Sequence, residues 1–485
     1  MLACIYSVAL TSAALADWPM WGGSPNRNMV QRAARDLPVE WDIDNKTHLK
    51  WSAKVGSVCY GNPALADGKI VLGTNNDAPR DPAATGDRGV VMCFAADSGA
   101  FLWQDTYEKL AAGQAQDWPL QGICSSPAIA GQRVYYLTNR GQVVCADLDG
   151  FHDGENDGPE QTEAGADQHA ADIVWRYDLM AQLGVVPRFM AASNPLVENG
   201  RLYVVTSNGV DPNSGQIANA SAPSFVCLDS ASGRLVWQQG FGQAKPQGVE
   251  MAPLMEGQWG SVALTDALAD GKRQLLAPGG DGFLYALAPD SGALLWKQDC
   301  NPPGAKWRPG GGGDKCYLVA TPVYAEGRVF VATGQDPEHG GGPGNLLAID
   351  PSPQTTSENR VLWRLGDKAF GRSISTVAVQ AGVVYAAELD GFLHAIDAAT
   401  GKELWQHDML SQVWGSPLLA DGKLYLGDED GDVLVAAPGR ELKVLAENRL
   451  PDAIYGTPIA VGRTLYLATR GELYALEAPQ PSAKE

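Results

Sequence analysis

Two glycine-rich loops contain side chains that could bind a ligand. The stretch GQDPEHGGGPGN, residues 334–345, contains Asp336, Glu338 and His339, and the stretch FGRSIS places Arg372 just before an apolar run. A carboxylate, an imidazole and a guanidinium gathered at one mouth can bind an anionic or polar ligand. The alternative, which the sequence favours, is a pair of solvated loops whose glycines form turns.

A third glycine-rich loop lies between two cysteines. The segment KWRPGGGGDK adds four polar or aromatic side chains, Lys306, Trp307, Arg308 and Asp314. Cys300 and Cys316 flank it, and a disulfide between them would restrict the unfolded loop. Two free thiols are the alternative. The six histidines form no Ser/His/Asp arrangement by spacing, so nucleophilic catalysis is not supported.

The stretch DGFHDGENDGPE, residues 149–160, partly fits a twelve-position calcium loop. Positions one, five, nine and twelve would be Asp149, Asp153, Asp157 and Glu160. Position three is Phe151, which cannot coordinate a cation. A calcium-stabilised insertion is one interpretation, and an acidic, solvated loop is the default.

These loops connect the units of a repeat that covers most of the chain. Segments such as HAIDAATGKELWQ recur, each preceded by an apolar strand and, before that, by a short strand with Ser, Asn or Thr, usually followed by Pro. The apolar residues alternate with period two, and Asp-Gly or Ser-Gly pairs separate the runs. This pattern predicts four antiparallel strands per unit, joined by tight turns.

Eight units are expected, and the two chain ends should share one of them. The last unit stops after ELYALE, residues 472–477, without an outer strand, whereas HLKWSAKV, residues 48–55, supplies such a strand. Pairing these segments would close a ring with few exposed strand edges. We therefore predict an all-β, eight-bladed β-propeller over residues 48–477. Residues 17–47 precede it, and residues 478–485 form a tail.

Register along the repeats points to the axis of this ring. In each unit a small residue precedes the Ser/Asn/Thr residue, and the position just before that small residue should lie at the mouth of the axial funnel. Four of these eight positions are aromatic: Tyr60, Trp259, Trp414 and Tyr455. Their rings could stack on a planar cofactor, a sugar or a peptide side chain. The alternative, favoured on packing grounds, is that they fill the wide central channel.

The recurring motif at the end of most units has a structural interpretation. A tryptophan such as Trp405 ends most units, and its side chain can pack against the neighbouring blade. Because the motif recurs around the ring, whereas an axial ligand needs one site, we expect it to serve repeat packing. One repeat position holds only small residues, and its cysteines, Cys93, Cys145 and Cys227, are expected to be buried packing thiols.

The motif AIDAATGKELW resembles the PQQ-type repeat of quinoprotein alcohol dehydrogenases and of the assembly factor BamB. The resemblance covers roughly residues 48–477. It implies a propeller, and for the dehydrogenases it implies PQQ with calcium on the axis beneath a disulfide of two adjacent cysteines. Here no two cysteines are adjacent, and there is no CxxCH haem motif. Both departures disfavour PQQ with calcium and a typical dehydrogenase.

Composition and the first residues suggest an exported protein. The net charge of −20 argues against nucleic acid as a partner. No internal apolar run is long enough to span a bilayer. Residues 1–16 are apolar and end in Ala14-Leu15-Ala16, which is typical of a secretory signal peptide cleaved after Ala16. We expect a periplasmic or secreted protein.

Three functions are compatible with these features. The first is a non-catalytic scaffold that binds a protein or polysaccharide of the cell envelope. The second is a PQQ-dependent oxidoreductase of alcohols or sugars with an atypical cofactor site. The third is a glycan-binding or glycan-processing propeller, for which the sequence offers no paired-carboxylate geometry.

Overall fold

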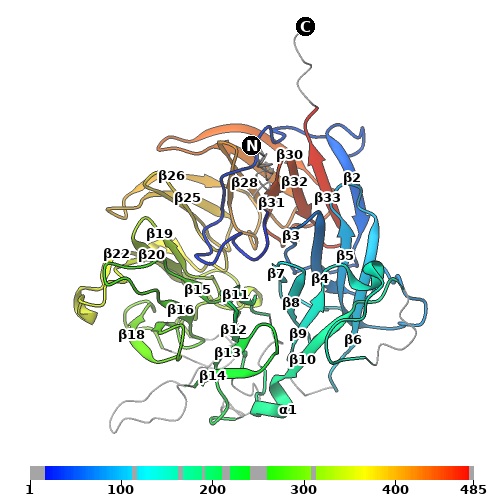
Figure 1. Cartoon of the computed structure of the whole chain (residues 1–485). Coiled ribbons are helices and arrows are strands. Elements are labelled where there is room, and N and C mark those ends of the chain that lie inside the picture. The colour runs from blue at the N-terminus through cyan, green and yellow to red at the C-terminus, as the bar shows by residue number, and fades with distance from the viewer. Residues whose placement is uncertain are drawn as a thin grey trace, which may run out of the picture.

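The computed structural model describes residues 17–111, 117–161, 168–187, 192–209, 219–240, 259–306 and 313–479. They form an eight-bladed β-propeller, in which eight antiparallel sheets surround a common axis (Figure 1). The signal-like residues 1–16 lie outside the described residues. No helix in the described part of the chain has the length and apolar character needed to cross a membrane.

The first four blades follow one another along the chain. Blade 1 contains β3 (Ala64–Ala66), β4 (Lys69–Asn75), β5 (Arg88–Ala95) and β6 (Phe101–Glu108). Blade 2 contains β7 (Ala128–Ala130), β8 (Arg133–Leu137), β9 (Gln142–Asp147) and β10 (Ile173–Asp178). Blade 3 contains β11 (Leu196–Glu198), β12 (Arg201–Val205), β13 (Phe225–Asp229) and β14 (Leu235–Gln239). Blade 4 contains β15 (Ala263–Leu264), β16 (Leu275–Pro278), β17 (Phe283–Leu287) and β18 (Leu294–Asp299).

The remaining blades complete the ring. Blade 5 contains β19 (Val323–Ala325), β20 (Arg328–Ala332), β21 (Pro343–Ile349) and β22 (Val361–Gly371). Blade 6 contains β23 (Ala378–Gln380), β24 (Val383–Ala387), β25 (Phe392–Asp397) and β26 (Glu403–Asp408). Blade 7 contains β27 (Leu418–Ala420), β28 (Lys423–Gly427), β29 (Asp432–Ala437) and β30 (Lys443–Arg449). Blade 8 contains β31 (Ile459–Val461), β32 (Thr464–Ala468), β33 (Glu472–Glu477) and, from the N-terminal region, β2 (Leu49–Lys54).

Short helical segments lie in the connections. They are α1 (Leu179–Leu183) and the 3₁₀ turns η1 (Gly150–Asp153), η3 (Pro337–His339) and η4 (Ser357–Asn359).

The predicted closure of the ring is confirmed. Strand β2 pairs antiparallel with β33, and Trp51 lies opposite Ala475. Central strands such as β4 are buried along almost their whole length, whereas β2 alternates between buried and exposed residues. This difference follows from position, because central strands are covered on both faces by neighbouring blades and the outermost strand faces solvent on one side.

Tryptophans on the outermost strands join each blade to the next. Six of them donate an indole N–H to a backbone carbonyl of the following blade at 2.8–3.1 Å: Trp51, Trp103, Trp175, Trp237, Trp363 and Trp405. Trp296 donates to the side chain of Gln274, and the Arg360 guanidinium of blade 5 lies 4.4 Å above its ring. The motif therefore serves repeat packing, as the sequence predicts.

Small residues lie beside these tryptophans, across the sheet in every case and also from the next blade at Trp51, Trp103, Trp175, Trp237 and Trp363. Across the sheet, Trp103 and Trp237 pair with Cys93 and Cys227, and both thiols are buried and free. From the next blade, the glycine of a tight turn lies against the indole ring. At Gly401, for example, a β-carbon would come within 2.7 Å of Trp363. Small residues are required at both places because a larger side chain would collide with the indole.

Blade 7 has no tryptophan at this position, where Ala446 stands instead. The N-terminal segment packs there. The backbone N–H of Trp41 donates to the Asn448 side chain, which in turn donates to the carbonyl of Val39. Trp41 itself is buried in the adjoining core.

Residues 18–31, here called the strap, lie at the axis and contact all eight blades. The dark-blue segment at the centre of Figure 1 belongs to this N-terminal region. Backbone or side-chain hydrogen bonds join the strap to the innermost strand of each blade, or to the residues just before it, at Leu65, Ile129, Pro195, Leu264, Tyr324, Val379, Leu419 and Ala460. Strand β1 (Val30–Gln31) is the part of the strap that pairs in parallel with β27.

Arg27 anchors the strap inside the ring. Its side chain is fully buried and donates to the carbonyls of Trp21, Val262 and Pro195 at 2.7–3.0 Å. Burial lowers the pKa of the guanidinium to about 9. A buried charge is costly unless it is hydrogen-bonded, and here backbone carbonyls supply the bonds.

Candidate functional site

The axial cavity lies at the end of the ring from which the innermost strands start. All eight residues that the repeat register places at the funnel mouth line it: Tyr60, Cys124, Ala192, Trp259, Val319, Ile374, Trp414 and Tyr455. The cavity holds about 190 Å³. Trp21 of the strap also lines it, at the end where the strap fills the axis. The cavity is therefore a cup and not a through-channel.

The prediction that the four aromatic residues fill the channel is wrong. The strap fills it, because Trp18, Arg27 and Met29 of this segment are almost completely buried between the innermost strands. Tyr60, Trp259, Trp414 and Tyr455 remain partly accessible at the cavity wall. Residues 17–47 contain no pattern that resembles the repeats, so this role could not be predicted from register.

Hydrogen bonds between blades fix the shape of the cup. Two residues after each funnel-mouth residue, a Ser, Asn or Thr side chain accepts a hydrogen bond from the backbone N–H of the corresponding residue in the preceding blade, at 2.5–3.2 Å. The eight members of this belt are Asn62, Ser126, Asn194, Ser261, Thr321, Thr376, Ser416 and Thr457. Thr457 donates to Asn62, so the belt closes on itself.

Three aromatic rings form one wall of the cup. Tyr60 and Trp414 stack with 5.8 Å between ring centroids, and Tyr455 lies 5.1 Å from Tyr60 and 4.8 Å from Trp414. The Tyr455 hydroxyl donates to the Glu429 carboxylate at 3.2 Å. Burial raises the pKa of both tyrosines, so the phenols stay neutral. This wall offers flat, apolar faces with few donors.

The opposite wall is acidic. Blade 5 contributes Asp336 and Glu338, which line the cavity at the 3₁₀ turn η3. The Asp336 carboxylate caps this turn by accepting the backbone N–H of Glu338 at 3.0 Å. Glu338 is exposed. Its negative charge contributes to the raised pKa of Tyr60, so the two side chains interact electrostatically.

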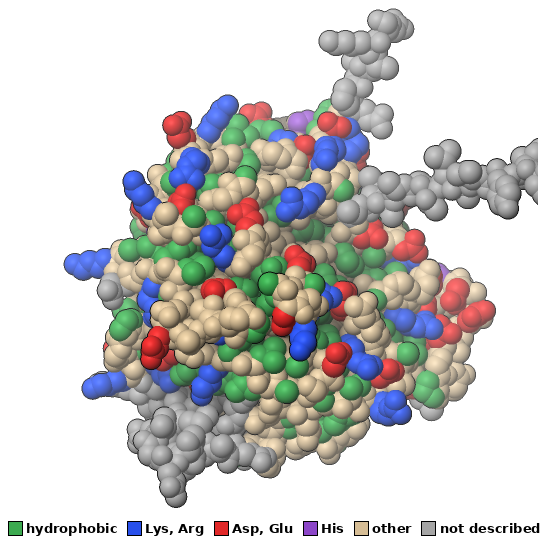
Figure 2. Space-filling model, turned by 60° about the vertical axis from the view of Figure 1, so that its left-hand side comes forward, with side chains coloured by type: hydrophobic (Ala, Val, Ile, Leu, Met, Phe, Trp, Pro, Cys, Tyr) green, Lys and Arg blue, Asp and Glu red, His purple; other side chains and the backbone are tan. Residues whose placement is uncertain are grey.

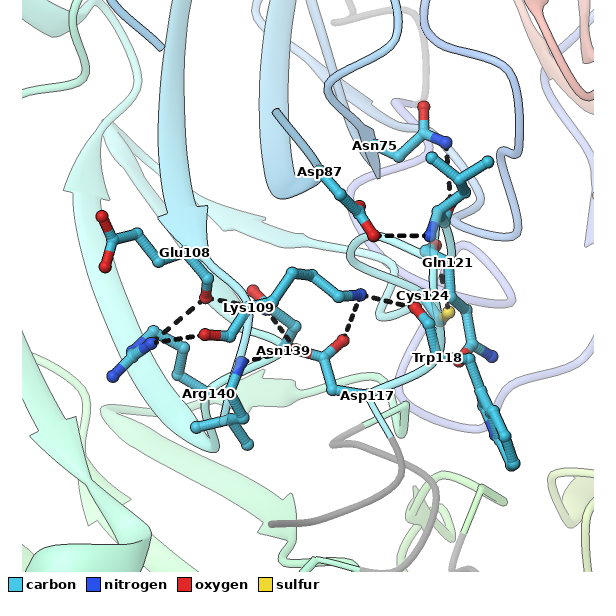
Figure 3. A network of polar contacts seen from close by, with 12 residues as sticks. Asn75, Asp87, Glu108, Lys109, Asp117, Trp118, Gln121, Cys124, Asn139 and Arg140 are labelled. Atoms are coloured by element: carbon cyan, nitrogen blue, oxygen red, sulfur yellow. Dashed lines mark hydrogen bonds and ion pairs between the residues drawn. The ribbon is translucent and has the colours of Figure 1, made fainter. Parts of the chain in front are cut away.

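A polar network holds the rim between blades 1 and 2 (Figure 3). Lys109 forms an ion pair with the buried Asp117 and donates to the Trp118 carbonyl at 2.7 Å. Asn139 donates to Asp117 at 2.9 Å. These contacts fix the segment that leads to Cys124, and they leave the Trp118 side chain 48% exposed at the edge of the cup. Sequence analysis missed Trp118 because it lies in a connection without repeat register.

Two predicted site residues have other roles. Arg372 is buried and donates to the carbonyls of His339, Gly340 and Gly341 at 3.2–3.3 Å, so its guanidinium holds the glycine-rich loop. Neither Arg372 nor His339 lines the cavity. Asp336 does, with Glu338 beside it. Of the third glycine-rich loop, Trp307 and Arg308 lie outside the described residues.

The structure does not bring the predicted calcium ligands together. Asp149 pairs with Lys69 at 2.8 Å, Asp157 with Arg133 at 2.6 Å, and Glu160 with Arg176. Asp153 accepts the backbone N–H of Glu155. Each carboxylate therefore already has a partner, and for three of them this partner is a lysine or arginine on a strand, which the loop sequence alone could not indicate. Within the described ranges, no group of three or more His, Cys, Asp or Glu is arranged to hold a metal ion.

The predicted disulfide is not formed in the structure. Cys300 and Cys316 are both buried, free thiols. The Cys300 thiol contacts the carbonyl of Gln298, and the Cys316 thiol contacts those of Asp314 and Pro343. The loop between them is held instead by backbone and amide contacts, such as Gln335 to the carbonyl of Lys315 at 3.0 Å.

Comparison with known proteins agrees with the repeat. A family model described as outer membrane protein assembly factor BamB matches residues 343–480. BamB of Moranella endobia (strain PCIT) is 22% identical over 392 residues, which is 80% of each chain. The chain is a PQQ-like repeat protein.

Solved structures of such repeat proteins share its fold. BamB from Moraxella catarrhalis superposes with a TM-score of 0.55 at 14% identity, covering 90% of this chain and 99% of the other. Quinohemoprotein alcohol dehydrogenase from Comamonas testosteroni gives a TM-score of 0.50 at 12% identity, covering 98% and 83%. PQQ-like repeat proteins thus include both assembly factors and dehydrogenases, and the residues of the site must be used to distinguish between these two functions.

The described lining of the cup contains no cation that could pair with the carboxylates of PQQ. Its charged residues are Asp336 and Glu338, which are acids. The chain has no pair of adjacent cysteines to cover the cofactor. The aromatic wall could stack on a planar ring, but the charges beside it have the wrong sign.

Proposed function

We propose that this PQQ-like repeat protein is a non-catalytic binding scaffold of the cell envelope that receives a segment of a partner protein in its axial cup. One observation carries the proposal: eight equivalent residues line a single cavity whose far end is filled by the strap. A rigid cup that combines apolar faces with several polar groups is suited to holding a side chain or a chain segment.

The rim of the cup supports a protein partner. Trp118 is 48% exposed, Leu120 is 42% exposed, and Leu410, between β26 and β27, is 87% exposed. These residues lie in connections on the side of the ring where the cup opens, since both connections lead into innermost strands. Exposed apolar groups around a concave site are typical of protein-binding surfaces. Elsewhere, as Figure 2 shows for one face, acidic and basic side chains are intermingled.

An envelope location is supported by two independent features. The relatives are named for outer membrane assembly, and residues 1–16 have the composition of a secretory signal peptide. Fractionation of cells that produce the full chain, with protease access to the periplasm, tests this directly. A protein that remains cytoplasmic with residues 1–16 still attached would contradict it.

Site-specific photo-cross-linking tests the binding role. A photoreactive phenylalanine replaces Trp118 at the rim or, as the control, Ser98, an exposed residue of a turn at the opposite end of blade 1. Binding in the cup predicts one discrete protein adduct from position 118 in intact cells and none from position 98. Equal labelling from both positions, or an adduct with polysaccharide only, would contradict a protein segment in the cup.

The alternative is a PQQ-dependent oxidoreductase with an atypical site, and the aromatic wall is the observation that favours it. Titration of the purified chain with PQQ and Ca²⁺, monitored by quinone absorbance, distinguishes the two proposals. The scaffold predicts no saturable change and no dye-linked oxidation of alcohols or sugars. Saturable binding that is lost on Trp414→Ala would favour the oxidoreductase.

A further inference from the structure

We infer that the group received by the cup is a cation, namely a lysine or arginine side chain of the partner segment, held between the aromatic wall and the acidic wall. This inference rests on the proposed binding function and specifies the chemistry of its ligand. It is argued from the kind and placement of the groups around the cavity.

The aromatic wall is suited to a cation. Tyr60, Trp414 and Tyr455 come from blades 1, 7 and 8 and form one cluster, and Trp259 of blade 4 and Trp118 at the rim also line the cavity. The face of an aromatic ring is electron-rich and attracts an ammonium or guanidinium group within about 6 Å of its centroid. Several rings around one small cavity increase this attraction.

The charged wall has the complementary sign. Glu338 stands on blade 5, which is diametrically opposite blade 1 in a ring of eight, and Asp336 lies beside it in the lining. Glu429 adds a third carboxylate behind Tyr455. A cation between the two walls would contact aromatic faces on one side and carboxylates on the other.

One cation near the cup opposes this preference at the aromatic wall. Arg470 lowers the pKa of Tyr60 by more than Glu338 raises it, although Arg470 is not part of the described lining. Lys109 is paired with Asp117 beneath the rim. The described lining itself therefore includes carboxylates and no cationic side chain. An anionic ligand would meet repulsion there, whereas a cation gains from both walls.

Three small probes of nearly the same shape test the sign of the ligand. Tetramethylammonium, tert-butanol and trimethylacetate are respectively cationic, neutral and anionic, and ligand-observed NMR measures their binding to the mature chain. The inference predicts that tetramethylammonium binds most tightly and trimethylacetate least. It also predicts that a short lysine-containing peptide binds. The same peptide should bind more weakly when all its amino groups, including those of the lysine side chains, are acetylated.

Variants locate the effect in the cup. Glu338→Gln should weaken binding of tetramethylammonium about fivefold, the scale of one exposed charge contact, and added salt should weaken the wild type more than the variant. Trp414→Leu should also weaken it. Glu441→Gln, which removes the same charge from an exposed turn between β29 and β30, should have no effect.

The outcomes separate this inference from the proposed function. If tert-butanol binds as well as tetramethylammonium, or if Glu338→Gln leaves the affinity unchanged, the cationic ligand is refuted. If the acetylated peptide then still binds and Trp414→Leu weakens it, the cup remains a protein-binding site for an apolar group. If neither peptide nor any probe binds, both the inference and the proposed function fail.

Discussion

The contact between a turn glycine and the tryptophan of the preceding blade can be tested with two glycines of blade 6. Gly401 and Gly382 both have φ +74°, a conformation that L-residues adopt with strain. A β-carbon at Gly401 would lie 2.7 Å from Cδ2 of Trp363, whereas one at Gly382 would meet no atom within 4 Å. Replacing each with alanine adds the same strain, but only Gly401→Ala adds an overlap with the indole.

The expected magnitudes follow from these contacts. Backbone strain costs about 1–2 kcal/mol, and the stiffer unfolded chain returns about 0.4–1 kcal/mol, so Gly382→Ala should lower the free energy of unfolding by about 1.6 kcal/mol or less. Overpacking in a filled core costs a further ~1–3 kcal/mol. Gly401→Ala should therefore be the less stable variant by that additional amount.

Guanidinium unfolding, followed by tryptophan fluorescence and circular dichroism, measures the difference as a lower transition midpoint for Gly401→Ala. The double variant Gly401→Ala, Trp363→Leu should lose less free energy of unfolding than the two single variants lose together, because the smaller side chain leaves room for the methyl group. Equal midpoints for Gly401→Ala and Gly382→Ala would refute the idea that these glycines are required by the tryptophan joint.

Three further changes test other parts of the architecture. Arg27→Met should lower the free energy of unfolding by about 3–5 kcal/mol, because it leaves the carbonyls of Trp21, Val262 and Pro195 without this donor. Arg32→Met, at an exposed position of the same region, should change the denaturant midpoint little. Asn62→Ala should cost about 1–3 kcal/mol by removing the acceptor of the Thr457 N–H, while Asn45→Ala, in an exposed turn, is the control; similar thermal midpoints for the two would argue against the belt. Burial lowers the pKa of His394, but hydrogen bonds to Glu388 and Glu403 at 2.8 Å outweigh it, so the pKa is raised overall. The stability that the protonated His394 contributes is then complete below the ordinary histidine pKa and is lost as pH rises through the raised value. The denaturant midpoint should therefore fall less between pH 6 and 9 in His394→Gln than in the wild type. Parallel pH profiles of the two proteins would contradict this.

The repeat made the ring predictable, because every blade obeys the same local chemistry. Eight units, closure by residues near Trp51 and the funnel positions of Tyr60 and Trp414 all follow from register alone, and the structure confirms them. A pattern that occurs in eight units stays recognisable even when one unit departs from it.

The parts that sequence analysis missed occur once. The strap lacks any periodic pattern, and its fit depends on the diameter of the finished ring. Arg372 and Asp149 are charged loop residues whose ligand role was inferred from composition, yet both are engaged by groups distant in sequence, the glycine-rich loop and Lys69. A side chain's partner across the fold cannot be derived from its neighbours along the chain.

The strap also sets the order in which this molecule can be assembled. Residues 18–31 are synthesised, and cross any membrane, before the rest of the chain, but their hydrogen-bonding partners extend from Leu65 to Ala460. Their hydrogen bonding can therefore be completed only when the last blade exists. Because such long-range docking is slow compared with the local hairpins, we expect complete docking of the strap to be a late event in folding.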